Sequence, residues 1–285
     1  MIDKPFCVFI ISHGRPDNVP TQRTLKRCGY KGPLFIVCDN EDKTVDQYRK
    51  NYGEAKVLVF NKLHYASLVD SCDNFDNRRT TTHARNACFD LAKDRGFEFF
   101  LVLDDDYMAF RFNYDAAGVF KRTKVKDITT LFLSAFRFLD SDERIDSVCF
   151  IQGGDLIGGE NGIRTGIFPF RKRKAMNSFF CKTARRFWFF SRLNEDVNTY
   201  LTRGSRGRIF LSIPDVALNQ AQTQTTSGGM SDAYLASGTY VKSFYSVMIT
   251  PSFAKVTAQI AMGRLHHRIS WNNAIPKILD DQHKK

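Results

Sequence analysis

An amphipathic segment that leads into an apolar strand and ends in three carboxylates constrains this chain more than any other feature. The segment begins near His83 and carries its apolar side chains at helical spacing up to Gly96, which predicts a helix that Gly96 terminates. The residues from Phe97 to Leu103 are then almost all apolar, as in a strand covered on both faces of a mostly parallel sheet. This pattern predicts an α/β fold, in which ligands bind beyond the carboxyl ends of the strands.

Three aspartates, Asp104, Asp105 and Asp106, follow that strand directly. Acidic residues after a strand often form solvated turns, and a turn remains the alternative interpretation. Adjacent carboxylates repel one another unless a cation neutralises them, however, and three in a row favour a metal site. Because side chains alternate along a strand, Asp104 and Asp106 are expected to face the metal together. Their hard oxygen atoms favour Mg²⁺ or Mn²⁺.

Further apolar runs alternate with helical or polar segments along the chain. Runs at residues 6–12, 34–38, 56–60 and 98–103 predict strands of a parallel sheet with helices on its faces. Asp127 precedes an amphipathic segment and is expected to cap a helix there, and residues 147–151 predict another strand. Six glycines at residues 152–166 predict a loop, with a phosphate-binding backbone as the alternative.

Length and composition set the outer bounds. The 285 residues are enough for one large α/β domain or two small ones, and 26 phenylalanines can fill a substantial core. No apolar run is long enough for a membrane span, and the N-terminus lacks the pattern of a signal peptide. Seven cysteines without a paired Cys-x-x-Cys framework predict reduced thiols in a cytoplasmic protein.

Positive charge is concentrated in one region. Residues 164–208 contain twelve basic and two acidic residues, and so carry ten of the chain's twelve net positive charges. Such a one-sided run favours a polyanionic partner, although it could also be a solvated face. The expected nucleic-acid contacts are Arg171, Lys172, Arg173, Lys174, Arg185 and Arg186. Aromatic residues interleave with these charges, and they either stack on unpaired bases or form core strands.

The order of four motifs carries a resemblance to a known fold. Residues 6–16 combine an apolar strand with a Ser-His-Gly-Arg-Pro loop, and residues 34–39 form a strand that ends in an aspartate. An Arg-Asn pair then lies on the helix before the Asp-x-Asp motif, and Asn194-Glu195-Asp196 follows later. In this order the motifs resemble those of nucleotide-sugar-dependent glycosyltransferases of the A-type fold, over most of residues 5–270.

The resemblance implies a Rossmann-like, mostly parallel central sheet flanked by helices, in a single domain of residues 1–285. Residues 1–106 would form the nucleotide-sugar-binding half, and residues 107–285 the acceptor-binding half. It also implies a UDP-sugar donor and Mn²⁺ or Mg²⁺, with His266 or His267 completing the metal site of Asp104 and Asp106. The implied donor-binding residues are His13, Arg15, Asp39, Arg85, Asn86, Asp104 and Asp105.

Several of these residues also have plainer interpretations. His13 and Arg15 could form a structural turn, Arg85 and Asn86 could lie on the surface, and a late histidine is usually structural. Glu195 and Asp196 could be first-turn acids that a helix dipole stabilises. On the functional interpretation, Asp196 is a general base that takes a proton from the acceptor hydroxyl.

The resulting hypotheses belong to different classes of protein. The chain is similar to the TET-associated glycosyltransferases of bacteriophages, which implies transfer of a sugar to a hydroxymethylated pyrimidine in DNA, such as 5-hydroxymethylcytosine. A sugar transferase with a protein or glycan acceptor and a non-catalytic nucleic-acid-binding module are the alternatives. A metal nuclease or nucleotidyltransferase would also need carboxylates, but no further catalytic acid or lysine at motif spacing is apparent.

Overall fold

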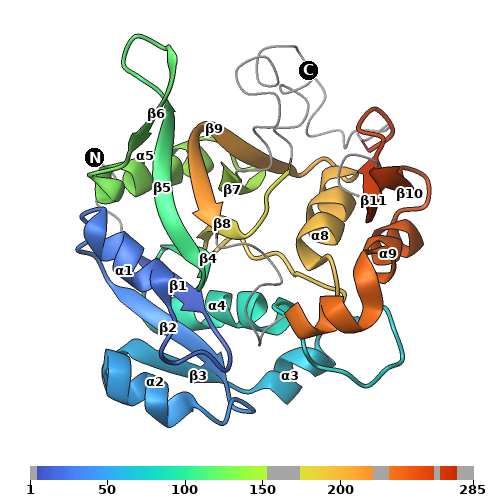
Figure 1. The fold of residues 1–285 in the computed structure, drawn as a ribbon, viewed down its shortest axis with the longest axis horizontal. Coiled ribbons are helices and arrows are strands. Elements are labelled where there is room, and N and C mark those ends of the chain that lie inside the picture. The colour runs from blue at the N-terminus through green and yellow to red at the C-terminus, as the bar shows by residue number, and fades with distance from the viewer. Residues whose placement is uncertain (1–4, 153–173, 221–230, 260–263, 275–285) are drawn as a thin grey trace.

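The computed structural model describes residues 5–152, 174–220, 231–259 and 264–274 (Figure 1). The helices in this part of the chain are α1 (Pro20–Arg27), α2 (Val45–Tyr52), the short 3-10 turn η1 (Glu54–Lys56), α3 (Lys62–Ser67), α4 (Thr82–Asp94), α5 (Ile128–Asp140), α8 (Glu195–Gly204) and α9 (Ser231–Ile249). The strands are β1 (Phe6–Ile11), β2 (Leu34–Asp39), β3 (Val57–Phe60), β4 (Phe99–Asp104), β5 (Tyr107–Tyr114), β6 (Phe120–Lys124), β7 (Ile145–Gln152), β8 (Ser178–Lys182), β9 (Ile209–Gln220), β10 (Ala254–Gln259) and β11 (Arg264–Ile269).

A nine-stranded sheet in the order β3-β2-β1-β4-β8-β7-β9-β5-β6 forms the centre of the molecule. Strands β3, β2, β1 and β4 are parallel, and β7 and β9 are also parallel to each other. Strand β8 runs antiparallel to β4 and β7, and β5 runs antiparallel to β9 and β6. The predicted α/β class is confirmed, and the sheet is parallel in its N-terminal half and mixed beyond β4.

Helices cover both faces of this sheet and bury two separate apolar cores. One core joins the sheet to α1, α2 and α5 through residues such as Leu25, Tyr48 and Phe132. The other joins it to α4 and α8 through residues such as Phe89 and Val197. Strand β4 contributes to both cores, because its side chains alternate between the faces. Its continuous apolar sequence follows from this position.

The local signals in the sequence are confirmed where the structure describes them. Gly96 follows α4 with φ of 71°, and the Asp127 carboxylate accepts a hydrogen bond from Thr130 N at the start of α5. The predicted strands correspond to β1, β2, β3, β4 and β7. Of the glycine-rich segment 152–166, only Gln152 is among the described residues.

Four aromatic side chains of the basic region belong to the core rather than to a base-stacking surface. Phe179, Phe180, Phe187 and Phe189 are each at most 1% exposed. All seven cysteines are free thiols, as the sequence predicts. Among the described residues, no helix combines the length and the apolarity needed to cross a bilayer.

Candidate active site

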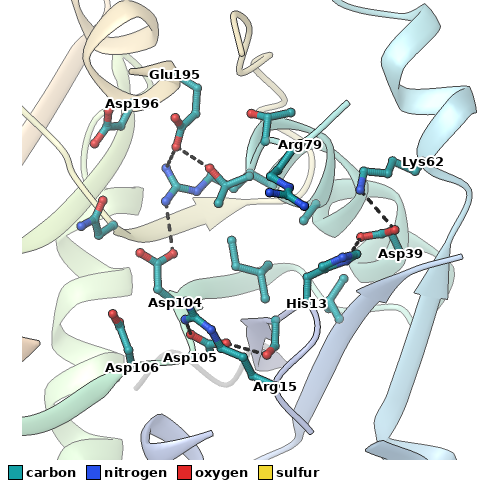
Figure 2. A pocket seen from close by; sticks show the side chains of 18 of the residues that line it. His13, Arg15, Asp39, Lys62, Arg79, Asp104, Asp105, Asp106, Glu195 and Asp196 are labelled. Carbon is teal, nitrogen blue, oxygen red and sulfur yellow. Dashed lines mark hydrogen bonds and ion pairs between the residues drawn. The ribbon is translucent and has the colours of Figure 1, made fainter. Parts of the chain in front are cut away.

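A pocket opens at the carboxyl ends of β1, β2 and β4, where an α/β sheet places its ligand. All three aspartates of the motif line it, and Figure 2 shows Glu195 and Asp196 across the pocket from Asp104. The other predicted residues that line it are His13, Arg15, Asp39 and Arg85. Residues more than 180 positions apart in sequence therefore share one cavity.

Each aspartate of the motif is held by a different part of the chain. Asp105 accepts hydrogen bonds from Ser12 Oγ at 2.6 Å and from Arg15 Nη1 at 3.2 Å, both at the end of β1. Asp106 accepts from Nε2 of Gln220, at the end of β9, at 2.9 and 3.0 Å. Asp104 accepts from Arg85 Nη2 on α4 at 3.2 Å. The motif therefore joins the parallel and mixed halves of the sheet.

The carboxylates of this cluster resist ionisation. Burial, followed by the charges of Asp106 and Asp105, raises the pKa of Asp104 to about 7 against the effect of Arg85. Burial and Asp105 likewise raise the pKa of Asp106 to about 6, although the hydrogen bond from Gln220 opposes the shift. Desolvated acids that repel one another are stabilised in their charged form by a nearby cation.

Arg85 connects this cluster to the second acidic motif. Its guanidinium is buried, with the side chain 2% exposed, and its Nη1 lies 2.8 Å from Glu195 Oε1. The Thr81 hydroxyl donates to the same Glu195 oxygen at 2.6 Å. The guanidinium also lies over the ring of Phe179, 4.8 Å from its centroid. Arg85 is therefore a buried bridge between Asp104 and Glu195.

Glu195 and Asp196 are first-turn residues of α8, as the plainer interpretation expects, and both also line the pocket. Asn194 precedes the helix in a left-handed conformation, with φ of 54°. Asp196 accepts a hydrogen bond from Val197 N at 2.7 Å. Burial and the adjacent Glu195 raise the pKa of the Asp196 carboxyl. Such a shift moves a carboxylate toward the pKa that suits a general base near neutral pH.

The opposite side of the pocket carries a hydrogen-bonded trio (Figure 2). His13 Nδ1 lies 2.7 Å from Asp39 Oδ2, and Lys62 Nζ donates to Asp39 Oδ1 at 3.3 Å. The hydrogen bond to Asp39 raises the pKa of His13. Burial acts to raise the pKa of Asp39, but His13 and Lys62 together lower it. At neutral pH this side of the pocket therefore presents an ionised carboxylate flanked by donors.

Three sequence-predicted residues, Asn86, His266 and His267, lie away from the pocket lining. The Asn86 side chain is buried and pairs with both backbone groups of Phe189, donating at 2.8 Å and accepting at 2.9 Å. His267 Nδ1 lies 3.3 Å from Asn194 Nδ2, behind the acidic motif, and His266 Nδ1 lies 3.0 Å from the His267 carbonyl. The structure therefore does not bring either histidine together with Asp104 and Asp106.

The described side chains offer a cation two carboxylates rather than a complete ligand set. Asp104 and Asp106 both line the pocket, but this part of the chain contains no group of three or more His, Cys, Asp or Glu that could hold a metal ion. Hard oxygen donors of this kind fit Mg²⁺, which usually retains waters and substrate oxygens as ligands.

The predicted nucleic-acid contacts are only partly described. Arg171, Lys172 and Arg173 lie outside the described residues. Arg185 Nη1 donates to three backbone carbonyls, and Arg186 Nη1 lies 2.5 Å from Asp90 Oδ1. These two arginines therefore stabilise the fold. The sequence pattern did not reveal these contacts, because the partners lie at least 40 positions away.

Several residues of the pocket escaped sequence reasoning. Lys62 lies two residues after the end of β3, so its position near a strand end could have identified it. Gln220 ends a strand that the sequence did not predict. Arg79 and Lys242 also line the pocket, but they come from a loop and from α9, and no local pattern marks them.

Comparisons with known proteins place the chain in a family. Residues 6–229 match the family described as TET-associated glycosyltransferase. No curated protein matches. The solved structures that are similar include glucosyl-3-phosphoglycerate synthase from Mycobacterium tuberculosis in complex with Mg²⁺ and uridine-diphosphate, at 9% identity over 94% of this chain and 88% of that chain, with a TM-score of 0.48. A putative nucleotide-diphospho-sugar transferase from Desulfovibrio desulfuricans G20 is 11% identical over 85% of this chain and 93% of that chain, with a TM-score of 0.44.

The family match includes nearly all residues of the pocket, from the loop after β1 to the acidic motif of α8 and Gln220. The sheet order and the position of the Asp-x-Asp motif at its carboxyl edge agree with the A-type fold that the sequence predicted. The chain therefore belongs to the TET-associated glycosyltransferases and is a glycosyltransferase of the A-type fold.

Proposed function

We propose that this glycosyltransferase moves a sugar from a nucleotide-sugar donor, with a divalent cation, to a hydroxyl group of a modified base in DNA. The observation that carries the proposal is the pocket itself, in which Asp104 and Asp106 face the acidic motif of α8. A cation would supply positive charge to the donor diphosphate as the sugar leaves. The residues of the chain would bind and orient the donor and deprotonate the acceptor hydroxyl.

Asp104 and Asp106 are the residues that would hold Mn²⁺ or Mg²⁺. Their raised pKa values support this assignment, since a bound cation stabilises the ionised carboxylates that burial and mutual repulsion destabilise. His266 or His267 could complete the set only if the chain rearranged, because His267 now contacts Asn194. Oxygens of a diphosphate are the ligands best suited to fill the remaining positions.

Positively charged residues line the pocket beside the carboxylates and would bind the donor. Arg15, Arg79 and Lys242 supply charge that suits a diphosphate. Asp39, with His13 and Lys62, offers an acceptor flanked by donors at the end of β2, which suits hydrogen bonding to a ribose or a base. A UDP-sugar donor is consistent with this arrangement.

Asp196 would act as the general base. The acceptor oxygen forms a bond to the sugar carbon, its proton passes to the Asp196 carboxylate, and the bond from the sugar to the diphosphate breaks. Arg85 pairs directly with Glu195, while the positive charges of Arg85 and Lys242 favour the ionised form of Asp196 that accepts the proton.

The proposed acceptor is the hydroxymethyl group of 5-hydroxymethylcytosine in DNA. A net charge of +12 favours a polyanionic substrate, and the family name supports a modified pyrimidine. A base must leave the helical stack to reach a recessed pocket, and an enzyme that modifies it binds the flanking phosphates. A protein or glycan acceptor remains the alternative within the same enzyme class.

A panel of labelled nucleotide sugars, with and without Mn²⁺, tests the donor and the metal. The wild-type protein is expected to turn over one donor only with the cation, and Asp106→Ala to abolish turnover because a ligand is lost. Asp94→Ala, which removes an exposed carboxylate at the end of α4, is the matched control. Full activity of Asp106→Ala, or of the wild type in chelator, would contradict the metal assignment.

Hydroxymethylated DNA added to the successful donor reaction tests the acceptor. Covalent transfer of the label to this DNA, and not to the same duplex with unmodified cytosine, is the expected result. Donor turnover that labels only protein or glycan would support the alternative acceptor.

A further inference from the structure

The described part of the predicted nucleic-acid region uses most of its positive charge within the protein. Lys182 pairs with Asp140, and Arg192 pairs with Asp73. Buried Asp146 pairs with two arginines, Arg203 and Arg208. Charges that are neutralised in this way contribute little to the binding of a polyanion. The exposed charge that binds a nucleic acid must therefore be sought elsewhere among the described residues.

Two other basic runs lie in the N-terminal half of the chain. The first, between residues 18 and 38, contains no acidic residue and carries Arg23, Lys26, Arg27 and Lys31. The second, between residues 116 and 126, also lacks acids and carries Lys121, Arg122, Lys124 and Lys126.

All eight side chains are exposed, and none of them makes an ion pair with a described residue. The acids that flank the second run are already engaged in local structure: Asp127 caps α5, and Asp115 accepts hydrogen bonds within its own turn.

The fold places the two runs side by side, and Figure 1 shows α1 and the β5–β6 hairpin on the same side of the molecule. Gly29, with φ of +83°, lies so close to Lys126 that a Cβ atom there would be 2.7 Å from the Lys126 carbonyl oxygen. The Arg27 guanidinium donates to the carbonyl of Met108 on β5 at 2.7 Å. We refer to the surface made by these eight basic residues as the α1–β6 face.

A groove deepens one part of the α1–β6 face. Lys26 and Lys31 line it together with Lys56 and the rings of Tyr30 and Tyr52. No carboxylate is among the described residues that line this groove. Three ammonium groups around a hollow without acids provide a favourable position for a phosphate.

The α1–β6 face begins beside the candidate active site. The hydroxyl of Thr21, in the first turn of α1, donates to the Asp104 carbonyl at 2.7 Å and accepts from Tyr107 N at 2.8 Å. Helix α1 and strand β5 both leave the pocket from this point. At roughly 1.5 Å per residue in a helix and 3.3 Å in a strand, the basic residues of α1 lie about 3–9 Å along the helix from this point, and Lys124 and Lys121 of β6 lie about 13–20 Å along the hairpin. Phosphates that flank a base in the pocket would lie at a similar distance.

We infer that the α1–β6 face binds the phosphate backbone of duplex DNA that presents its base to the pocket. The inference rests on the proposed nucleic-acid acceptor. Lysines on β6 alone could simply protect an edge strand from pairing with another molecule. That explanation does not extend to α1 or to the groove, because their basic residues do not lie on the edge strand β6.

Two triple variants that lose the same charge test the inference. Lys26→Gln, Lys31→Gln and Lys124→Gln together remove charge from the α1–β6 face. The control combines Lys93→Gln, Lys255→Gln and Arg268→Gln, which are exposed and lie outside the face and the pocket. Binding to a hydroxymethylated duplex is measured against salt concentration, and donor hydrolysis without DNA is measured in parallel.

The face variant is expected to lower the slope of log affinity against log salt by up to about three units, since each phosphate contact contributes about 0.9. The control is expected to keep the wild-type slope, and both variants are expected to hydrolyse the donor at the wild-type rate. An unchanged slope in the face variant, or an equal loss in the control, would overturn the inference alone. A wild-type protein that turns over the donor but does not bind DNA would overturn the proposed acceptor and this inference together.

Discussion

Arg85 lies between carboxylates from two motifs that are about 90 positions apart, Asp104 after β4 and Glu195 at the start of α8. Removal of a buried cation leaves buried negative charges without compensation, which is far more costly than the net stabilisation that the intact pair provides. Arg85 therefore helps to hold the acidic motif in place, whereas the sequence suggested a donor contact or a surface position for it.

Arg85→Gln is expected to lower the free energy of unfolding by about 3 kcal/mol at neutral pH. Glu195→Gln in the same chain should restore part of the loss, because one of the uncompensated charges is then absent. Urea unfolding of the two single variants and the double variant measures this coupling. Strictly additive losses would show that the two side chains do not interact.

Asp196→Asn addresses the chemical step. The variant is expected to bind donor with nearly wild-type affinity, while the rate of transfer falls roughly a hundredfold to ten-thousandfold, the usual contribution of a general base. Steady-state kinetics with separate measurement of donor binding distinguish the two effects. A parallel loss of donor affinity would make Asp196 a residue of the donor site instead.

Residue types and strand ends were sufficient to predict much of the pocket. Asp104, Asp105, Asp39 and His13 each follow an apolar strand, and parallel strands bring their carboxyl ends together. Asn86 was misleading because a polar residue beside Arg85 can equally satisfy a buried backbone, which a sequence pattern cannot reveal.

At the scale of elements, charge pairing across the sheet determines how α8 and β9 are attached. Asp146 in β7 is fully buried and accepts hydrogen bonds from Arg203 in α8 and from Arg208 just before β9. A count of charges within residues 164–208 omits this aspartate, because it precedes the region in sequence. In the described part of the region, the predicted excess of positive charge is therefore largely neutralised by acids from outside it.

Asp146→Asn is expected to destabilise the protein by about 2 kcal/mol, since hydrogen bonds to charged groups typically contribute 1.5–3 kcal/mol. Donor hydrolysis should persist at temperatures well below the unfolding midpoint, because Asp146 does not line the pocket. Thermal unfolding and donor hydrolysis, measured together, check this. A loss of activity without a loss of stability would show that the attachment of α8 is itself needed for turnover.

The elements that the sequence predicted are the regular ones. Strands β1, β2, β3 and β4 have continuous apolar runs, whereas β5, β6 and β9 mix polar and apolar residues, and β9 contains Pro214. A strand of mixed sequence lacks the continuous apolar run by which the buried parallel strands were predicted. The order of the strands in the mixed half depends on contacts that are distant in sequence, and no local pattern contains them.

For the whole molecule, the acidic cluster makes stability depend on pH and on the cation. The folded pKa of Asp104, about 7, lies above the value of an ordinary aspartate, so the folded state holds a proton that the unfolded state releases. This contribution to stability is complete below about pH 4 and is lost as the pH rises through 7. A divalent cation acts in the opposite direction, because it binds the ionised carboxylates.

Mn²⁺ is therefore expected to raise the unfolding temperature more at pH 8 than at pH 5.5. Thermal unfolding at both pH values, with Mn²⁺ and with chelator, measures the difference. Asp106→Ala should abolish the effect of the cation at both pH values. An equal rise in the wild type at pH 5.5 and pH 8 would contradict the assignment of Asp104 and Asp106 as ligands.

The route of the chain after β4 has a consequence for how the protein matures. Between Asp104 and Tyr107 the backbone leaves the middle of the sheet and enters β5, which β8, β7 and β9 separate from β4. The Asp106 contact with Gln220 therefore cannot form until the last of these strands has been synthesised and inserted. A nascent chain that has completed only its parallel half already contains all three aspartates but not their final arrangement. The final arrangement of the three aspartates thus forms late in folding, after most of the chain has left the ribosome.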